Sequence, residues 1–356
     1  MSLQGAERIA SQTKDLWLRK IIEELKASAE SIDSSASSHP DPKKLRTVYF
    51  GGGTPSLLEP EAIAAILDTV KSLWPHRFEE ITLEANPETV TTEKARFWKD
   101  AGITRLSLGV QTFKPELLRR LERLATADDL ARACDIAKEI FSHWSLDLMI
   151  GIPDGNAEDL ESDLSRVANY DPPHLSIYLL TLTKDHIWYR SPTMKTKLPA
   201  DDAAAQFYVR VCEWARSRGY HHYEISNFAK PGFESVHNAN YWNTSSSYLA
   251  VGPGAHGYLQ SIEGDRMRTI VESDLKAWLA GKEAQIEILS EEQKRLEEAY
   301  MNLRLNRGIS VNMNVNRAAK VAALESEGLI EIREQRIFLT ESGWLCMESL
   351  AEALIL

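Results

Sequence analysis

The amino-acid sequence predicts an α/β fold in which parallel strands form an incomplete barrel, followed by a small α+β domain. Short apolar runs that end in glycine, an acid or an amide alternate with stretches of about ten or more residues that have helical periodicity. Repeated strand–helix units of this kind favour a parallel sheet with helices packed against it. Beyond Ser290 the alternation stops, and two helical runs are followed by a hairpin pattern and a closing helix. This change of character predicts a separate C-terminal unit.

The composition is that of an ordinary globular protein. The chain has 356 residues, of which 43% are apolar and 26% charged, which gives room for one large and one small domain. A net charge of −11 without a basic stripe argues against a nucleic-acid partner. No run approaches the roughly 20 apolar residues of a membrane span. With three cysteines and no secretory signal, we expect a cytoplasmic protein.

The predicted elements divide the chain into three parts. Residues 1–44 hold a leading helix, predicted over 15–30 from its apolar side, and a polar Ser/Pro-rich loop over 31–42 that we expect to be mobile. Residues 45–285 form the barrel and its extension. Residues 286–356 form an accessory domain with the outline of a winged helix. Its predicted elements are helices over 291–305 and 313–327, a hairpin over 329–339 and a helix over 340–356.

The first predicted strand of the barrel ends in a run of glycines. Val48 to Phe50 is a short apolar run, Gly51 to Gly53 follow it, and Thr54-Pro55 offers a helix start. Residues without Cβ let a ligand lie directly on the backbone, and the N–H groups that open a helix attract small anions or carboxylates. The same tripeptide is also compatible with a plain turn between a strand and a helix, so its neighbours decide the interpretation.

Polar residues accompany the next three predicted strands. These are Glu84, Gln111 and Asp147, in the runs 81–88, 105–111 and 145–153, with helices predicted over 60–73, 91–101 and 127–140. Because the carboxyl ends of parallel barrel strands meet at one edge, the three side chains and Gly51 to Thr54 should face one cavity. An acid within an apolar strand is costly without a partner or a ligand, so we interpret Asp147 as functional.

Seven ordered motifs make the chain resemble a known family. They are Gly-Gly-Gly-Thr-Pro at 51–55, Glu-Ala-Asn-Pro at 84–87, Gly-Val-Gln at 109–111, Leu-Asp-Leu-Met at 146–149, Gly-Ile-Pro at 151–153, His-Asn-Ala-Asn-Tyr-Trp at 237–242 and Gly-Pro-Gly-Ala-His-Gly at 252–257. Together they resemble the radical S-adenosylmethionine (SAM) family of oxygen-independent coproporphyrinogen III oxidases. The His-Asn-x-x-Tyr-Trp form looks closer to the branch called haem chaperones. The resemblance covers residues 45–356 and implies an incomplete (β/α)6 barrel of the radical-SAM type.

The resemblance also implies a SAM pocket. Its residues here are Gly52, Gly53, Thr54, Glu84, Gln111, Arg123 and Asp147. The two glycines and Thr54 would run along the methionyl part of SAM, and Glu84 would accept hydrogen bonds from the ribose hydroxyls. The other three side chains would complete the polar shell. For Arg123 the alternative is an exposed charge at a helix end.

The cluster loop of the family has no counterpart among the cysteines of this chain. Its Cys-x-x-x-Cys-x-x-Cys thiolates hold a [4Fe–4S] cluster that cleaves SAM reductively. Here Cys134, Cys212 and Cys346 stand alone in helix-like stretches, so we expect small buried hydrophobes, no metal site and no radical chemistry in this chain. Truncation of a longer protein and natural loss of the loop both remain open. The strand over 46–50 would then be an open sheet edge, and the oligomeric state is also left open.

Two histidines are candidate haem ligands. His237 and His256 lie in segments rich in Asn, Gly, Tyr and Trp, which favour loops that present side chains to a ligand. A hydrogen-bonding role within a loop is an equal alternative for each. His221 and His222 alternate along a predicted strand and point to opposite faces, so we interpret them as structural.

These features predict a coproporphyrinogen III oxidase-like protein of haem or porphyrin metabolism, most similar to a haem chaperone. Haem or a porphyrin would be its ligand and a haem-accepting protein its partner. Tyr178 and Tyr223 are candidates for the wall of the macrocycle site, with core packing as the alternative. The other functions left open are a haem carrier that does not use SAM, a piece of an active radical SAM oxidoreductase, and a barrel enzyme that keeps only the glycine loop. The sequence singles out no catalytic residue.

Overall fold

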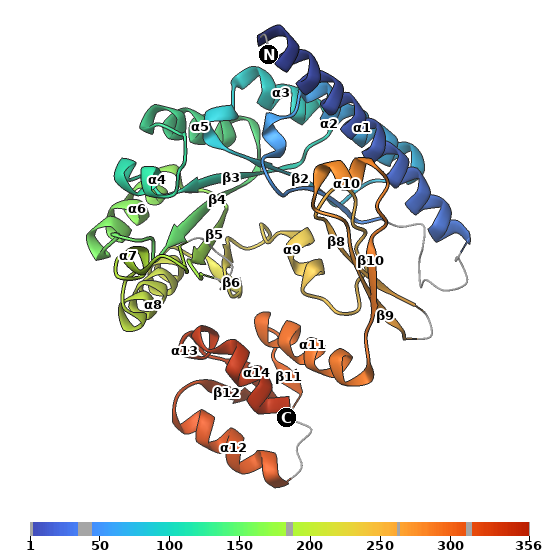
Figure 1. Ribbon diagram of the computed structural model, residues 1–356. Helices are drawn as coiled ribbons and strands as arrows, with labels where there is room; N and C mark the ends of the chain where they lie inside the picture. The colour runs from blue at the N-terminus through green and yellow to red at the C-terminus, as the bar shows by residue number, and fades with distance from the viewer. Residues whose placement is uncertain (1–2, 35–44, 183–187, 262–263, 311–314, 356) are drawn as a thin grey trace.

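A seven-stranded mixed sheet forms the centre of the computed structural model, which describes residues 3–34, 45–182, 188–261, 264–310 and 315–355. Its strands are β1 (Thr47–Phe50), β2 (Glu80–Ala85), β3 (Arg105–Gln111), β4 (His143–Ile150), β5 (His174–Leu179), β6 (His221–Glu224) and β7 (Asn227–Ala229). They lie in the order β1-β2-β3-β4-β5-β7-β6 (Figure 1). Strands β1 to β5 are parallel, and β7 and β6 return antiparallel beside β5. The predicted α/β half-barrel is confirmed.

Helices connect the parallel strands and cover the outer face of the sheet (Figure 1). They are η1 (Pro55–Leu57), α2 (Pro60–Leu73), η2 (Pro87–Thr89), α3 (Thr92–Ala101), α4 (Pro115–Arg120), α5 (Ala127–Ile140), α6 (Ala157–Tyr170), α7 (Pro192–Lys195) and α8 (Asp201–Ser217). Helices α2 and α5 begin and end where the sequence predicts. Capping boxes fix the starts of α5 and α6.

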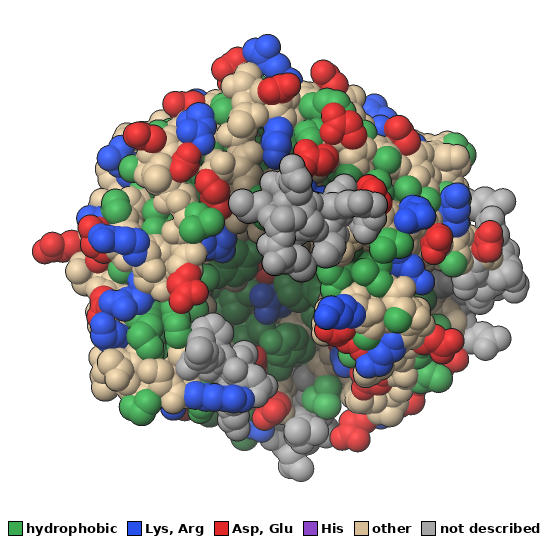
Figure 2. Space-filling model, turned by 45° about the horizontal axis from the view of Figure 1, so that its top comes forward, with side chains coloured by type: hydrophobic (Ala, Val, Ile, Leu, Met, Phe, Trp, Pro, Cys, Tyr) green, Lys and Arg blue, Asp and Glu red, His purple; other side chains and the backbone are tan. Residues whose placement is uncertain are grey.

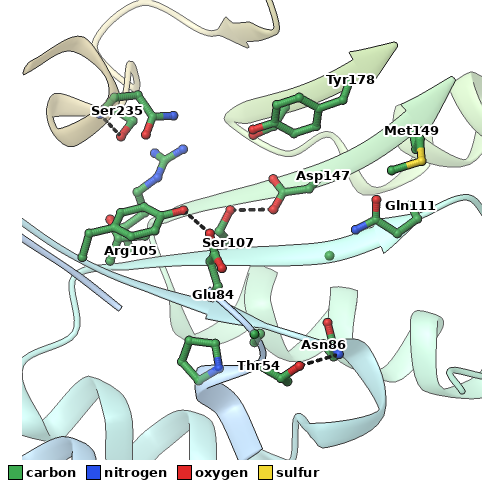
Figure 3. A pocket seen from close by; sticks show the side chains of 18 of the residues that line it. Thr54, Glu84, Asn86, Arg105, Ser107, Gln111, Asp147, Met149, Tyr178 and Ser235 are labelled. Carbon is green, nitrogen blue, oxygen red and sulfur yellow. Dashed lines mark hydrogen bonds between the residues drawn. The ribbon is translucent and has the colours of Figure 1, made fainter. Parts of the chain in front are cut away.

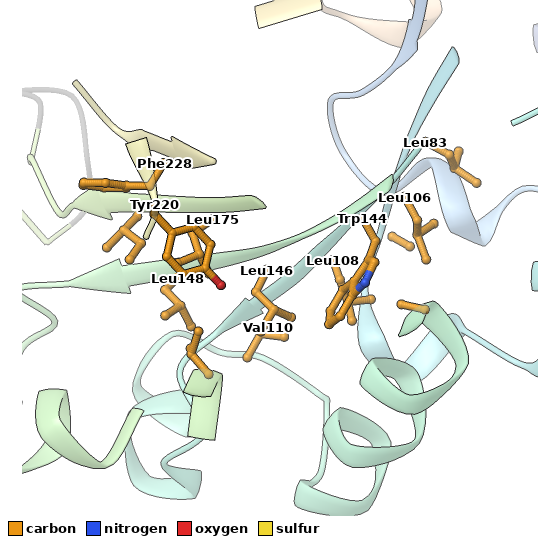
Figure 4. Packing of buried hydrophobic residues seen from close by; sticks show 14 of the residues in the cluster. Leu83, Leu106, Leu108, Val110, Trp144, Leu146, Leu148, Leu175, Tyr220 and Phe228 are labelled. Atoms are coloured by element: carbon orange, nitrogen blue, oxygen red, sulfur yellow. The ribbon is translucent and has the colours of Figure 1, made fainter. Parts of the chain in front are cut away.

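The hydrophobic core lies between the sheet and these outer helices (Figure 4). Leu83, Leu106, Leu108, Leu146 and Leu148 are at most 2% exposed. Side chains alternate between the two faces of a strand. The polar residues that alternate with these leucines therefore face the inside of the half-barrel.

The leading helix, α1 (Leu3–Ser34), is longer at both ends than the predicted 15–30. It packs along α2 and against α10 (Leu275–Leu279). Ile21 and Leu25 are buried, and Glu24 accepts a hydrogen bond of 2.6 Å from the indole of Trp278. The loop predicted to be mobile begins inside this helix and lies, from residue 35 on, outside the described residues.

A short helix and a second sheet follow the main sheet. Strands β8 (His256–Gln260), β9 (Arg266–Ile270) and β10 (Gln285–Ile288) form an antiparallel sheet in the order β10-β9-β8. The helix, α9 (Val236–Tyr241), packs against β1, which is an edge strand of the main sheet as predicted. Arg46 donates a hydrogen bond of 3.0 Å to the side-chain oxygen of Asn240 there. The edge is therefore partly covered by α9.

The C-terminal part has the order of elements expected of a winged helix. It consists of α11 (Glu291–Arg304), β11 (Ile309–Ser310), α12 (Val315–Ser326), β12 (Ile330–Arg333), β13 (Arg336–Leu339), α13 (Glu341–Leu345) and α14 (Met347–Ile355). The predicted hairpin turns through Glu334 and Gln335, both with positive φ. The single closing helix predicted over 340–356 is instead two helices that meet at Cys346. No helix within the described ranges has the length and apolar character needed to cross a membrane.

Candidate functional site

A cavity of about 370 Å³ lies on the inner face of the half-barrel. The space-filling view shows that this molecule is deeply hollowed at the centre of one face (Figure 2). Strands β1 to β5, the glycine loop after β1, and α9 all contribute residues to the cavity wall. Four of the predicted pocket side chains that line it are labelled in Figure 3, namely Thr54, Glu84, Gln111 and Asp147. Arg123 and Gly53 line it as well. Gly52 does not line it, but its N–H contacts the cavity residue Glu84.

The glycine loop holds the first acid of the pocket. The N–H of Gly52 donates a hydrogen bond of 3.1 Å to Glu84 Oε2, and the hydroxyl of Tyr49 donates one of 2.6 Å to Oε1. Gly52 and Gly53 have φ values of 76° and 61°, which favour glycine. At Gly51 the reason is space, because a Cβ would lie 2.4 Å from the ring of Tyr49. Both oxygens of Glu84 are thus fixed before any ligand arrives.

One detail of the predicted loop is wrong. Thr54-Pro55 opens only the three-residue 3-10 turn η1, and α2 begins later, at Pro60. Thr54 makes no capping hydrogen bond to η1. Its hydroxyl instead accepts a hydrogen bond of 3.3 Å from the amide of Asn86. The loop therefore presents backbone and the Thr54 side chain, and not the N-terminus of a long helix, to the cavity.

Two serines hold Asp147. Ser107 donates a hydrogen bond of 2.8 Å to Asp147 Oδ2, and Ser145 donates one of 3.3 Å to Oδ1. Ser107 and Ser145 are register partners on β3 and β4, and their hydroxyl oxygens lie 2.8 Å apart. Desolvation raises the pKa of Asp147 to about 6 although the serine hydrogen bonds oppose the shift. This acid can therefore gain or lose a proton near neutral pH.

Gln111 and Arg123 stand near the glycine-loop end of the cavity. Gln111 has a φ of 64°, in the left-handed region, where the register between β3 and β4 shifts. Such strain in a residue other than glycine is typical of functional positions. Arg123 donates a hydrogen bond of 3.1 Å to the side-chain oxygen of Asn86 and lines the cavity. The alternative of a free helix-end charge is therefore not observed.

Sequence reasoning missed several cavity residues that the strand period could have identified. Arg105, Ser107 and Gly109 alternate along β3 with Gln111, and all four line the cavity. The polar residues at every second position of this buried strand were the available signal. Tyr178, which was predicted, lines the cavity from β5, whereas Tyr223 is half-buried outside the cavity wall and its hydroxyl lies 2.8 Å from Nε2 of His174.

His237 lies directly behind the cavity wall. Its ring stacks on Tyr49 with centroids 4.6 Å apart, and its Nδ1 is 2.9 Å from the Thr47 hydroxyl. Burial lowers the pKa of this imidazole, which favours its neutral form. Tyr49 thus contacts His237 with its ring and Glu84 with its hydroxyl.

The expectation that both candidate histidines lie in loops is wrong. His237 belongs to α9, whose start is held by a buried acid, Glu80. Glu80 accepts hydrogen bonds from the N–H groups of Val236 and His237 and from the hydroxyls of Ser235 and Thr82. His256 begins β8, where it pairs with Ile270, and it is not a cavity residue. The structure therefore does not bring the two histidines to one site.

Of the other histidine pair, only His222 is packed in the core. His221 is exposed, whereas His222 stacks on Phe228 at 4.1 Å and meets the edge of Trp344 at the same distance. Burial lowers the pKa of His222 to about 3. This imidazole is a neutral core side chain that joins the main sheet to the C-terminal part.

The three cysteines lie apart from one another, two in separate helices and the half-buried Cys346 between two helices. Cys134 in α5 and Cys212 in α8 are buried in the core, as predicted, and burial raises the pKa of each thiol to about 12. Cys346 lies between α13 and α14. Within the described part of the chain, no three His, Cys, Asp or Glu side chains are grouped closely enough to hold a metal ion.

Comparison with known proteins identifies the family on both sequence and fold. Residues 25–167 match the Radical SAM superfamily, and residues 289–346 match the HemN C-terminal domain. The "Heme chaperone HemW" of Bacillus subtilis (strain 168) is 31% identical over 354 residues, which cover 95% of this chain and 90% of that protein. The protein of the same name from Lactococcus lactis subsp. lactis (strain IL1403) is 32% identical over 315 residues, 85% of this chain and 82% of that one.

A solved structure shares the fold over nearly the whole chain. Coproporphyrinogen III oxidase (HemN) from Escherichia coli, described as a radical SAM enzyme, superposes with a TM-score of 0.75 and 19% sequence identity. The match covers 96% of this chain and 83% of that one. From its sequence motifs, half-barrel and close relatives, the chain belongs to the radical SAM family of coproporphyrinogen III oxidase-like proteins, in the haem chaperone branch.

Proposed function

We propose that this chain binds haem as a haem chaperone does, passes it to an accepting protein, and binds SAM in the half-barrel cavity. The observation that carries the proposal is the position of Tyr49, which contacts both the candidate haem histidine and the candidate ribose acceptor. One side chain thus separates the two sites. A ligand at either site changes the surroundings of the other.

For SAM, the donors and acceptors of the cavity match the groups of the ligand. Glu84 keeps lone pairs free for a vicinal diol after it has accepted hydrogen bonds from Tyr49 and Gly52. Gly53 and Thr54 offer backbone and a hydroxyl to the methionyl part. Asp147, Gln111 and Arg123 supply the polar shell. When bound with a reducing cluster, SAM supplies radical chemistry.

The cysteines described above do not fit such a cluster. Cys134 and Cys212 are buried thiols in different helices, and their raised pKa values disfavour the thiolate that binds iron. These thiols therefore cannot support cluster chemistry at the cavity. The activity proposed for this chain is binding of haem, or of a related porphyrin, and SAM.

For haem, His237 is the better placed of the two candidates. Its Nδ1 is engaged by Thr47, which leaves Nε2 as the nitrogen for iron, and its lowered pKa favours the neutral, ligating form. His256 is exposed at the start of β8 and remains the second candidate. Because His237 lies behind the cavity wall, a haem carrier that does not need SAM is the alternative function.

The haem proposal is tested by titration of the chain with haem, followed by visible spectroscopy. We expect a Soret shift that His237→Ala abolishes and that His221→Ala, the loss of an exposed histidine, leaves intact. If His256→Ala abolishes the Soret shift instead, the axial ligand is His256 in β8. No shift in the parent chain would exclude axial ligation by either histidine.

The SAM proposal is tested by equilibrium dialysis. Asp147→Asn and Glu84→Gln should each weaken SAM binding on the order of tenfold, the usual effect of a lost charged hydrogen bond. Asp163→Asn is the matched control, because Asp163 is also a buried acid but holds the Thr112–Phe113 turn outside the cavity. Equal binding in all four proteins would show that SAM does not occupy this pocket.

A further inference from the structure

A buried arginine occupies one end of the pocket. Arg105 is the first residue of β3 and lines the cavity, yet it is only 3% exposed. Figure 3 shows its guanidinium group near Ser235, at the end of the pocket away from Gln111 and Asn86. A guanidinium stays charged inside proteins, and a buried charge is costly unless it is paired and hydrogen-bonded. The partner of this charge therefore needs an explanation.

The hydrogen bonds of Arg105 use little of its capacity. Among the residues that the structure describes, it makes one hydrogen bond, from Nη1 to the carbonyl oxygen of Phe233 at 3.4 Å. None of the ion pairs in those ranges includes it. A guanidinium carries five N–H donors in a planar fork. By contrast, Arg268, which is more exposed, forms ion pairs with Glu297 and Glu287.

The neighbouring groups do not supply the missing acceptor. The Ser235 hydroxyl donates to Glu80 and already accepts from the N–H of Asn238. The side-chain amide of Asn238, which also lines the cavity, makes no hydrogen bond within the described part of the chain. The nearby acids are hydrogen-bonded by other donors, Glu80 by Ser235 and Glu84 by Tyr49. Asp147 is held by Ser107, and the charge of Arg105 acts on it only through space. Within the described residues, a cationic fork with a single long hydrogen bond and an amide with none thus face the cavity.

We propose that Arg105, with Asn238 beside it, is the carboxylate-binding subsite of this pocket. The inference deepens the proposed function and rests on it, since it requires that the pocket binds a ligand. A planar guanidinium accepts a carboxylate through two parallel hydrogen bonds. Haem and porphyrins carry carboxylates on their propionate side chains, and SAM carries one on its methionyl group. Because the methionyl part is expected along Gly53 and Thr54, and Arg105 lies at the other end of the pocket, a propionate is the expected occupant. The recognised chemistry is the same for both, and the experiment distinguishes them.

The test compares each ligand with an analogue that lacks the carboxylate. Equilibrium binding is measured for SAM and decarboxylated SAM, and for coproporphyrin III and its tetramethyl ester. Each pair is measured with the parent chain, with Arg105→Gln and with Arg96→Gln. Arg96 is the matched control, because it is an exposed arginine on the outer helix α3. Circular dichroism verifies that each variant is folded.

We expect the parent and Arg96→Gln to prefer the free acid of at least one pair on the order of tenfold or more. In Arg105→Gln this preference should vanish, while the affinity for the neutral analogue is kept. The pair that loses its preference identifies the ligand whose carboxylate is bound. An undiminished preference in folded Arg105→Gln would overturn the proposal.

A second variant keeps the buried arginine and serves if Arg105→Gln does not fold. Asn238→Asp places a carboxylate of the chain itself next to the guanidinium. We expect a higher melting temperature and loss of the acid preference, because the subsite is then filled from within. A preference that survives in Asn238→Asp would count against the subsite.

The outcome also separates this inference from the proposed function. If the parent chain binds neither SAM nor coproporphyrin, the proposed function fails by itself. The subsite is then judged with glutarate alone, as a simple dicarboxylate. A rise in melting temperature that Asn238→Asp removes would support the subsite, and the absence of any rise would overturn it.

Discussion

Two buried acids on the same sheet differ in how their oxygens are used. Glu80, at the start of β2, accepts four hydrogen bonds, two of them from backbone N–H groups that open α9. Asp147, inside β4, accepts hydrogen bonds from two serine hydroxyls and faces the cavity. Sequence alone made Asp147 the candidate and did not mention Glu80.

This difference distinguishes a structural acid from a functional one. An acid whose acceptor capacity is filled by the fold has nothing left for a ligand, and its burial indicates a role in stability. Asp147 keeps acceptor capacity toward the cavity, and desolvation raises its pKa, so its charged form is costly in the empty pocket. A ligand that donates a hydrogen bond to this carboxylate lowers that cost. Three substitutions test this distinction.

The largest effect is expected at Glu80. Glu80→Ala removes a charged acceptor from the start of α9 and leaves the N–H groups of Val236 and His237 buried without a partner. We expect a loss of about 3–5 kcal/mol in the free energy of unfolding. Urea denaturation measures it, with Glu139→Ala as control, since Glu139 forms only an exposed 3.8 Å pair with Arg96. If Glu80→Ala loses no more free energy of unfolding than Glu139→Ala, Glu80 does not stabilise the start of α9.

A smaller, pH-dependent effect of opposite sign is expected at Asp147. Its folded pKa of about 6 lies above the unfolded value of about 3.9, so the native state binds the proton more tightly. The carboxyl group therefore lowers stability as pH rises from about 4 to about 6, and the full penalty is present above that window. Asp147→Asn removes the penalty and should stabilise the chain by about 1–3 kcal/mol at pH 7.5.

Thermal unfolding at several pH values measures this difference between Asp147→Asn and the parent. The gain should shrink toward zero near pH 4, where the parent carboxyl group is also neutral. The pKa of Asp163 is likewise raised to about 6, but this acid holds the N–H of Phe113. Asp163→Asn should therefore not reproduce the gain. A gain at Asp147 that is independent of pH would point to packing and not to the charge.

The smallest effect is expected at the side chain between the two candidate sites. Tyr49→Phe removes the hydrogen bond to Glu84 but keeps the ring on which His237 stacks. We expect a stability loss of about 1 kcal/mol, weaker SAM binding and unchanged haem binding. The three measurements on one variant separate the hydroxyl from the ring. A parallel loss of haem binding would mean that Glu84 acts on both sites.

Local patterns predicted the fold of the half-barrel well. Helices over 60–73 and 127–140 and the strand over 105–111 have the predicted bounds, because period and capping residues are local signals. The helix α9 was missed for the opposite reason. Its residues, Val-His-Asn-Ala-Asn-Tyr, are mostly weak helix formers, and the acid that holds its start lies 156 positions earlier in the chain.

The candidate site shows the same division. Thr54, Glu84 and Gln111 follow from their places at strand ends and Asp147 from being an acid within an apolar strand, and the structure gathers all four at one cavity. Arg105 stands at the opposite end of its strand, where barrel sites are not normally sought. Its significance rests on the lack of an ion-pair partner among the residues that the structure describes, which no local sequence pattern reports.

The six residues of α9 connect parts of the molecule that the chain order keeps apart. Its start is fixed to the sheet by Glu80, His237 lies on Tyr49, and Trp242 at its end lies 4.0 Å under the guanidinium of Arg304 in α11. Thermodynamic linkage follows from this geometry. If a ligand at His237 displaces α9, it changes the free energy of the Arg304 contact, and movement of the C-terminal domain then alters affinity at His237 by the same factor. A partner that binds only the C-terminal domain would thereby change the affinity for a ligand at His237 without touching that site.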